Sequence, residues 1–169
     1  MTAGGSSRML EPVSAVHCLE ATPDVGFRRL LRTGRHEDAT TCPLSPQADS
    51  VKTAREVTRH TLRDWGCPQL GEDAALVVSE LVTNAVRYAL HGVRRYDDHP
   101  ITLLLLRMSP HVLLAVSDPS DEVPVPREPD FISEHGRGLY IVDTYSKAWG
   151  WETLEEGGKA VWALFRADR

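Results

Sequence analysis

The sequence predicts an α+β fold, a two-layer α/β sandwich in which a mostly antiparallel sheet of four or five strands carries three helices on one face. Two observations support this fold. Apolar runs come in two pairs, each separated by a short turn, which is typical of β-hairpins. Three other stretches have apolar residues at helical spacing. Helices gathered on one face of an antiparallel sheet bury both kinds of apolar surface.

The first predicted elements are a short strand and a helix. Residues 39–45 form the strand, which Pro46 closes. Residues 45–66 form the helix, with Ser45 as its cap, Pro46 in its first turn and Gly66 at its end. Apolar residues at roughly helical spacing mark its buried face: Val51, Ala54, Val57, Leu62 and Trp65.

A second helix and a hairpin follow. The helix begins after Gly71 and runs to Gly92. The apolar runs ITLLLLRM (residues 101–108) and HVLLAVSD (residues 111–118) predict two strands joined by a tight turn at Ser109–Pro110.

The last elements come after a long loop. Residues 119–138 hold four prolines and have no useful period, and loops of about 20 residues in compact domains are usually functional or disordered. Residues 138–148 then predict a helix opened by glycine. Residues 149–156 and 159–167 predict a closing hairpin that turns at Gly157–Gly158.

The chain of 169 residues is predicted to form one domain, at residues 39–169. Residues 1–38 begin with the small residues MTAGGSSR and continue without a clear period. We interpret them as a flexible or unassigned leader, which could be an added helix, a partner-binding arm or a mobile segment.

Composition excludes several classes of function. A net charge of −5 argues against direct nucleic-acid binding and against binding to anionic membranes, since both need a basic field. No apolar run approaches the roughly 20 residues that span a bilayer, and the first residues lack an apolar signal core, so we expect a cytoplasmic protein. The three cysteines are far apart and suggest reduced thiols rather than a zinc site or a disulfide.

Two polar residues stand within the apolar pattern of the second helix. Glu80 and Asn84 are four residues apart and therefore lie on one face, one turn apart. A carboxylate beside an amide oxygen suits Mg²⁺, which takes its other ligands from water and phosphates. If Asn84 holds the metal, Glu80 remains to orient or deprotonate a nucleophile. The alternative is a solvated polar face.

Two further candidates lie at the ends of elements. Asp118 ends an apolar strand, where it either accepts a hydrogen bond from an amine such as that of adenine or caps the turn before Pro119. Gly136 and Gly138 stand where the long loop becomes a helix, so backbone N–H groups could approach an anion there, or the glycines mark a simple turn. Arg137 either adds a positive charge or is only exposed.

These motifs together resemble a known superfamily. The segments SELVTNAVRYA, AVSDPSDEVP, HGRGLYIVDTYSKAWGWE and GGKAVWALF, in that order, resemble the GHKL ATPases, which share the Bergerat ATP-binding fold. Within this superfamily the chain is most similar to RsbW-like anti-sigma factor serine/threonine kinases of the actinobacterial type. The resemblance covers about residues 40–167. It implies ATP and Mg²⁺ as cofactors.

The resemblance also assigns roles to residues. It implies that Glu80 is the general base, that Asn84 is the Mg²⁺ ligand and that Asp118 binds the adenine amine. Residues 119–135 would be the lid over ATP, and Gly136 and Gly138 would meet the phosphates. The remaining residues that the resemblance places around ATP are Arg87, Tyr88, Ser120, Val123, Arg137, Leu139 and Lys159.

The sequence departs from the family pattern at three places. Asp118 is followed by Pro119 and Ser120, whereas the DxG motif of the superfamily has a glycine two residues after the aspartate. Lys159 replaces a threonine that often follows the last glycine, which affects one water-mediated contact with adenine. Tyr88 stands where a histidine or lysine often follows the helical asparagine.

The function implied by the resemblance is partner switching. Proteins of this type sequester a sigma factor and phosphorylate a serine of a STAS-domain anti-anti-sigma protein, and they often form homodimers. A second interpretation is a non-catalytic ATP-binding module that only binds a regulatory protein. A histidine-kinase catalytic domain is disfavoured, because no helix pair with a phospho-accepting histidine surrounds His17, His36 or His60.

Overall fold

The computed structural model describes residues 38–92, 100–122, 138–155 and 157–168. The leader predicted at residues 1–38 therefore lies outside the described residues, apart from Asp38. In chain order, the elements are β1 (Asp38–Leu44), α2 (Asp49–Asp64), a short 3₁₀ turn η2 (Pro68–Leu70), α3 (Gly71–Gly92), β2 (Ile101–Met108), β3 (His111–Asp118), α4 (Gly138–Tyr145), β4 (Ala148–Thr153) and β5 (Lys159–Arg166).

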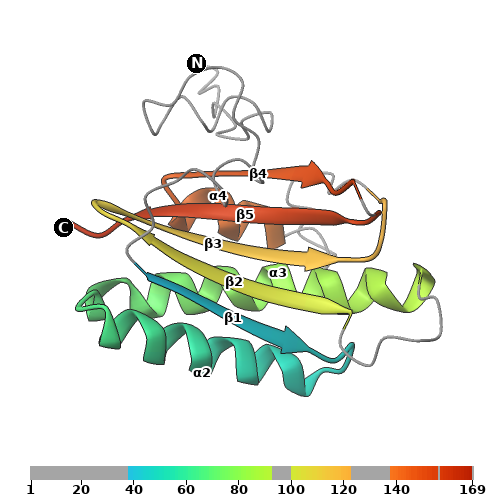
Figure 1. Ribbon diagram of the computed structural model, residues 1–169, viewed down its shortest axis with the longest axis horizontal. Coiled ribbons are helices and arrows are strands. Elements are labelled where there is room, and N and C mark those ends of the chain that lie inside the picture. Colours follow the sequence, from blue (N-terminus) through green and yellow to red (C-terminus); the bar gives the residue numbers. More distant parts are fainter. Residues whose placement is uncertain (1–37, 93–99, 123–137, 156, 169) are drawn as a thin grey trace, which may run out of the picture.

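The sheet has five strands in the order β1-β2-β3-β5-β4, and each of these pairings is antiparallel. The helices α2, α3 and α4 lie together on one side of it (Figure 1). The predicted fold class, an α+β sandwich with three helices on one face, is confirmed. Strands β3 and β5 are neighbours although α4 and β4 separate them in sequence, and this pairing is what later brings two functional side chains together.

Both faces of the sheet carry buried apolar side chains. Leu103, Leu105 and Val116 belong to the cluster that packs with the helices. Leu106 and Trp162, which point to the opposite face, belong to a second buried cluster. Successive side chains of a strand point to opposite faces, so a strand buried on both faces has no polar alternation. This explains why residues 101–106 form a continuous apolar run.

The start of the first helix differs from the prediction. Helix α2 begins at Asp49, and Ala48 precedes it with no side-chain cap. The predicted cap, Ser45, lies in a turn before the helix, where its carbonyl oxygen accepts hydrogen bonds from the backbone N–H of Gln47 (2.8 Å) and from the hydroxyl of Ser50 (2.7 Å). The polar residues before the helix form this turn instead of a first helical turn. The prediction of Ser45 as the cap was therefore wrong.

The other end of α2 and its buried face agree better with the prediction. Gly66 follows the helix with a φ of +72°, a backbone conformation that glycine tolerates. Ala54 and Leu62 are fully buried, as predicted. The other three predicted residues are partly buried against the same core: Val51, Val57 and Trp65.

The third helix is shorter than predicted. Helix α4 ends at Tyr145, and Ala148 already belongs to β4. The backbone N–H and the hydroxyl of Ser146 both donate to the carbonyl oxygen of Val142, at 3.1 and 2.6 Å. The backbone bond is the usual bond to the fourth preceding residue and still belongs to the last turn of the helix. The backbone N–H of the next residue, Lys147, donates instead to the carbonyl oxygen of Leu164 in β5 at 2.8 Å, which takes the chain out of the helix. The prediction that the helix continues to residue 148 was wrong, whereas the hairpin turn at Gly157–Gly158 is confirmed.

Candidate functional site

The two polar residues of α3 face the start of α4. Glu80 and Asn84 are half-buried, and Gly138 is the first residue of α4. A Cβ atom added at Gly138 would lie 2.9 Å from Oε2 of Glu80 and 3.6 Å from Nδ2 of Asn84. Only a residue without a side chain leaves this space open. The structure therefore brings together three residues that the sequence analysis singled out in two distant motifs.

The environment of Glu80 alters its acidity. Burial raises the pKa of the Glu80 carboxyl group above its ordinary value, and the charge of Arg87 opposes this shift. A carboxylate with a raised pKa holds a proton more tightly and is a better general base than an exposed one. The local environment thus suits the role that the resemblance implies for Glu80.

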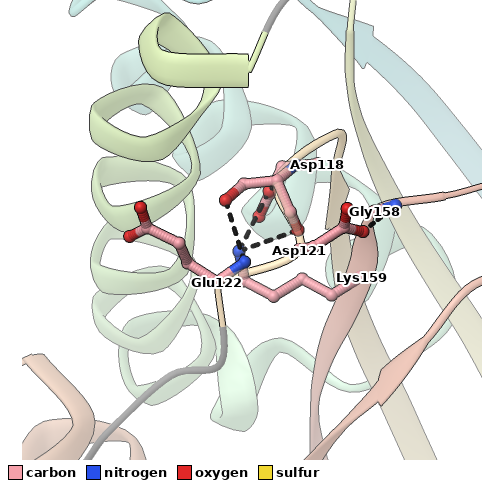
Figure 2. A network of polar contacts seen from close by, with 6 residues as sticks. Asp118, Asp121, Glu122, Gly158 and Lys159 are labelled. Carbon is pink, nitrogen blue, oxygen red and sulfur yellow. Dashed lines mark hydrogen bonds and ion pairs between the residues drawn. The ribbon is translucent and has the colours of Figure 1, made fainter.

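A second cluster forms where β3 and β5 pair. Asp118 ends β3, Lys159 begins β5, and the two residues are direct partners in the antiparallel register. Nζ of Lys159 lies 3.0 Å from Oδ1 of Asp118, and each side chain is only 3% exposed. The backbone N–H of Ser120 donates to the same oxygen at 2.8 Å. Figure 2 shows Lys159 reaching across to Asp118.

Burial raises the pKa of the Asp118 carboxyl group above its ordinary value, although the ammonium group of Lys159 and the N–H of Ser120 oppose this shift. Within residues 38–92, 100–122, 138–155 and 157–168, the two hydrogen bonds to this carboxyl group fall on Oδ1 rather than Oδ2. With respect to these residues, the second oxygen remains to accept a donor from a ligand.

Tyr88 connects the two clusters. The ring centre of Tyr88 lies 5.0 Å from Nζ of Lys159, a cation–π contact. Glu80, Asn84 and Tyr88 follow one another at four-residue spacing, so they form one stripe along α3 that is about 12 Å long. Gly138 lies at one end of the stripe and Lys159 at the other. The site is thus elongated, with an acidic and amide end and an end that holds the buried ion pair.

Asp121, which joins the chain after β3 to the last hairpin, was not among the residues predicted from the sequence. Oδ1 of Asp121 accepts a hydrogen bond from the N–H of Gly158 at 2.9 Å (Figure 2). The hydroxyl of Ser120 accepts one from the N–H of Glu122 at 3.1 Å. Gly158 has a φ of +82°, and a Cβ there would lie 2.2 Å from the carbonyl oxygen of Asp118. The run DPSDE, with two turn-forming aspartates, is the signal that could have indicated such a turn.

The remaining predicted site residues are placed as follows. Arg87 is exposed on α3 and acts on Glu80 through its charge. Leu139 is buried in the core that the helices cover. Val123, Gly136 and Arg137 lie outside the described residues, as does most of the predicted lid.

The residues present fit a nucleotide and its metal ion. Among the described residues, no group of three or more His, Cys, Asp and Glu side chains could hold a metal ion. A divalent ion at Asn84 would therefore need most of its ligands from phosphates and water, as Mg²⁺ commonly does. The space left open at Gly138 is where backbone could approach a phosphate. No described helix has the length and apolar character required to cross a membrane.

Comparison with known proteins identifies a family and a similar fold. The sequence profile of the family described as "Histidine kinase-like ATPase domain" (HATPase_c_2) matches residues 44–165. The fold is similar to that of a chain in the crystal structure of the SiaB–SiaC complex from Pseudomonas aeruginosa, with a TM-score of 0.54 and 16% sequence identity over 90% of this chain and 99% of that chain. A comparison with curated proteins found no match.

Proposed function

Because this chain belongs to the histidine kinase-like ATPase domain family, we propose that it binds ATP with Mg²⁺ and acts as a serine/threonine protein kinase. Its substrate in this proposal is a regulatory partner protein, and phosphorylation changes which partner it holds. Glu80 is the general base, Asn84 is the protein ligand of Mg²⁺ and Asp118 binds the adenine amine.

One observation carries this proposal most directly. Gly138 leaves open a space bounded by Oε2 of Glu80 and by the amide group of Asn84. A base, a neutral oxygen ligand and the N-terminal end of a helix thus converge on one point. Partial positive charge at a helix start favours phosphate, and an amide oxygen suits Mg²⁺. This is the combination that phosphoryl transfer requires.

The roles of the side chains follow from their chemistry. Bound ATP supplies the phosphoryl group, and Mg²⁺ offsets the negative charge of its phosphates. Glu80, whose pKa burial raises, accepts the proton of the attacking serine or threonine hydroxyl. Tyr88 and the Asp118–Lys159 pair border the other end of the stripe, where the base of the nucleotide would lie.

The proposed partners are a sigma factor and a STAS-domain anti-anti-sigma protein. The resemblance to RsbW-like proteins supports both partners. The similar fold in a chain of the two-protein SiaB–SiaC complex supports a protein partner in general. We also propose that the chain works in the cytoplasm, where a sigma factor would be available, and that a homodimer is its functional form.

The test is transfer of labelled phosphate from ATP to a panel of STAS-domain proteins in the presence of Mg²⁺. The parent chain is compared with Glu80→Gln and Asn84→Ala, and Glu72→Gln serves as a control because Glu72 is exposed near the start of the same helix. We expect Glu80→Gln to keep ATP affinity and to lose transfer by about 10²–10⁴-fold. Asn84→Ala is expected to lose Mg²⁺-dependent ATP binding.

The outcomes separate the two interpretations of the sequence. ATP binding by the parent without transfer to any STAS partner would support the non-catalytic binding module. Absence of ATP binding would refute the proposed function. Equal loss of transfer in the Glu72→Gln control would show that the effect of Glu80→Gln is not specific to the site.

A further inference from the structure

Lys159 occupies an unusual position for a lysine. Its ammonium group is buried between Oδ1 of Asp118 at 3.0 Å, the carbonyl oxygen of Ser120 at 3.5 Å and the ring of Tyr88 at 5.0 Å. Taking a lysine and an aspartate out of water is costly, and such a pair is often no more stable than apolar side chains of similar size. Stability alone therefore gives little reason to keep this pair.

The hydrogen-bonding capacity of the pair is asymmetric. An ammonium group carries three donors and no acceptor, whereas an ionised carboxylate only accepts. The two hydrogen bonds that Asp118 accepts from the described part of the chain fall on Oδ1, so these bonds leave Oδ2 to accept from a ligand. Next to it stands a group that only donates. The pair thus offers one fixed acceptor and one fixed donor side by side.

We propose that Lys159 determines base specificity by donating directly to N1 of adenine while Oδ2 of Asp118 accepts from the 6-amino group. This inference rests on the proposed binding of ATP. Guanine in the same orientation would turn its O6 toward the carboxylate and its N1–H toward the ammonium group. Both contacts would then be unfavourable, and a site with fixed polar groups rejects such a ligand strongly. A hydroxyl or a water could switch between donor and acceptor, whereas Lys159 cannot.

The ligand series isolates the contact. Affinities for ATP, GTP, 1-deaza-ATP and 7-deaza-ATP are measured by calorimetry for the parent chain. 1-Deaza-ATP has a C–H group in place of N1, and 7-deaza-ATP carries the same change on the other edge of the base. We expect 1-deaza-ATP to bind about 10–100-fold more weakly than ATP. GTP is expected to bind at least about 10³-fold more weakly, and 7-deaza-ATP nearly as well as ATP.

The variants test whether Lys159 is the donor. In Lys159→Met, ATP and 1-deaza-ATP should bind equally well. In Lys159→Gln, whose amide both donates and accepts, the preference for ATP over GTP should fall to about 10-fold or less. Lys159→Arg keeps the charge beside Asp118 but moves the donors. The ratio of its affinities for ATP and 1-deaza-ATP should therefore also differ from the parental ratio. Lys52→Gln, at an exposed position of α2, is the control and should keep all parental ratios.

Each result decides the matter. A parental affinity ratio near 1 between ATP and 1-deaza-ATP, or a loss for 1-deaza-ATP that persists in folded Lys159→Met, would overturn the inference and leave ATP binding intact. If the two neutral variants do not fold, the parental ratios together with those of Lys159→Arg decide. Absence of ATP binding by the parent chain would overturn both the inference and the proposed function.

Discussion

Replacing Gly138 by alanine is expected to separate activity from stability. The added Cβ would lie 2.9 Å from Oε2 of Glu80, whereas ordinary contacts begin at 3.4 Å. The carboxylate must therefore retreat by roughly 0.5 Å or more, since nonbonded repulsion rises steeply at shorter distances. Because this oxygen is the far end of a flexible side chain, Glu80 rotates and the backbone of α4 stays in place.

The two magnitudes follow from this geometry. Alanine fits a helical position at least as well as glycine does, so the free energy of unfolding should stay within about 1 kcal/mol of the parental value. Catalysis is far more sensitive to position, since displacement of a catalytic group by about 1 Å can cost about 10²-fold. We expect phosphoryl transfer to fall about 10–100-fold.

The assay combines transfer kinetics with thermal unfolding of the same preparations. Gly71→Ala is the matched control, because Gly71 is the first residue of α3 as Gly138 is of α4, and its added Cβ would lie 3.9 Å from Cγ of Arg59. This control should keep both activity and stability. Full activity of Gly138→Ala would refute the reasoning, as would a large loss of stability or an equal loss of activity in Gly71→Ala.

Three further predictions concern titration, the buried ion pair and a buried hydroxyl. Because burial raises the pKa of Glu80, the rate of transfer should fall as pH drops through that raised value, at a higher pH than an exposed carboxylate would give, and the residual rate of Glu80→Gln should not follow this profile. Lys159→Met should lower the free energy of unfolding by about 3–5 kcal/mol in denaturant titrations, and the added change Asp118→Asn should recover most of it. In Lys159→Met alone, the loss of unfolding free energy should be full above the raised pKa of Asp118 and should shrink as pH falls and the carboxylate takes up a proton. A loss of unfolding free energy that is independent of pH would contradict this. Thr58→Val should raise the free energy of unfolding by about 1 kcal/mol, because Oγ1 of Thr58 is the one buried side-chain polar atom without a hydrogen-bond partner in the described part of the chain, whereas Thr83→Val removes a bond to Ser79 and should give no gain.

Most of the fold could be predicted from the sequence because its elements have strong periods and clear ends. The hairpin at residues 101–118 was predicted with the bounds that the structure shows, and the long helix, predicted from after Gly71 to Gly92, begins one residue earlier, at Gly71. Element ends that depend on the choice of a hydrogen-bond partner were not. Ser45 looked like a helix cap but lies in a preceding turn, and α4 ends where the backbone N–H of Lys147 donates to Leu164 of β5. Polar side chains with several local partners do not reveal which one they choose.

The candidate site was predictable in part for a similar reason. Glu80 and Asn84 share a face because helical spacing is fixed, so their proximity follows from the sequence alone. The approach of Gly138 to them depends on how α4 packs on α3, which spacing does not encode. Asp118 and Lys159 are 41 positions apart along the chain, and their bond depends on the pairing of β3 with β5. From the sequence, Lys159 is one of the residues that the resemblance places around ATP and a departure from the family pattern, with no sign of its ion pair to Asp118.

In the proposed function, the stripe along α3 places selection of the nucleotide and chemistry on it at opposite ends. Asp118 and Lys159 belong to adjacent strands in the interior of the sheet, whereas Glu80 and Gly138 belong to two helices. Residue 159 could therefore be altered to accept a modified nucleotide that other kinases ignore, while the proton acceptor stays as it is. Such a variant would be an orthogonal enzyme, with which the targets of this one protein could be tagged selectively inside a cell.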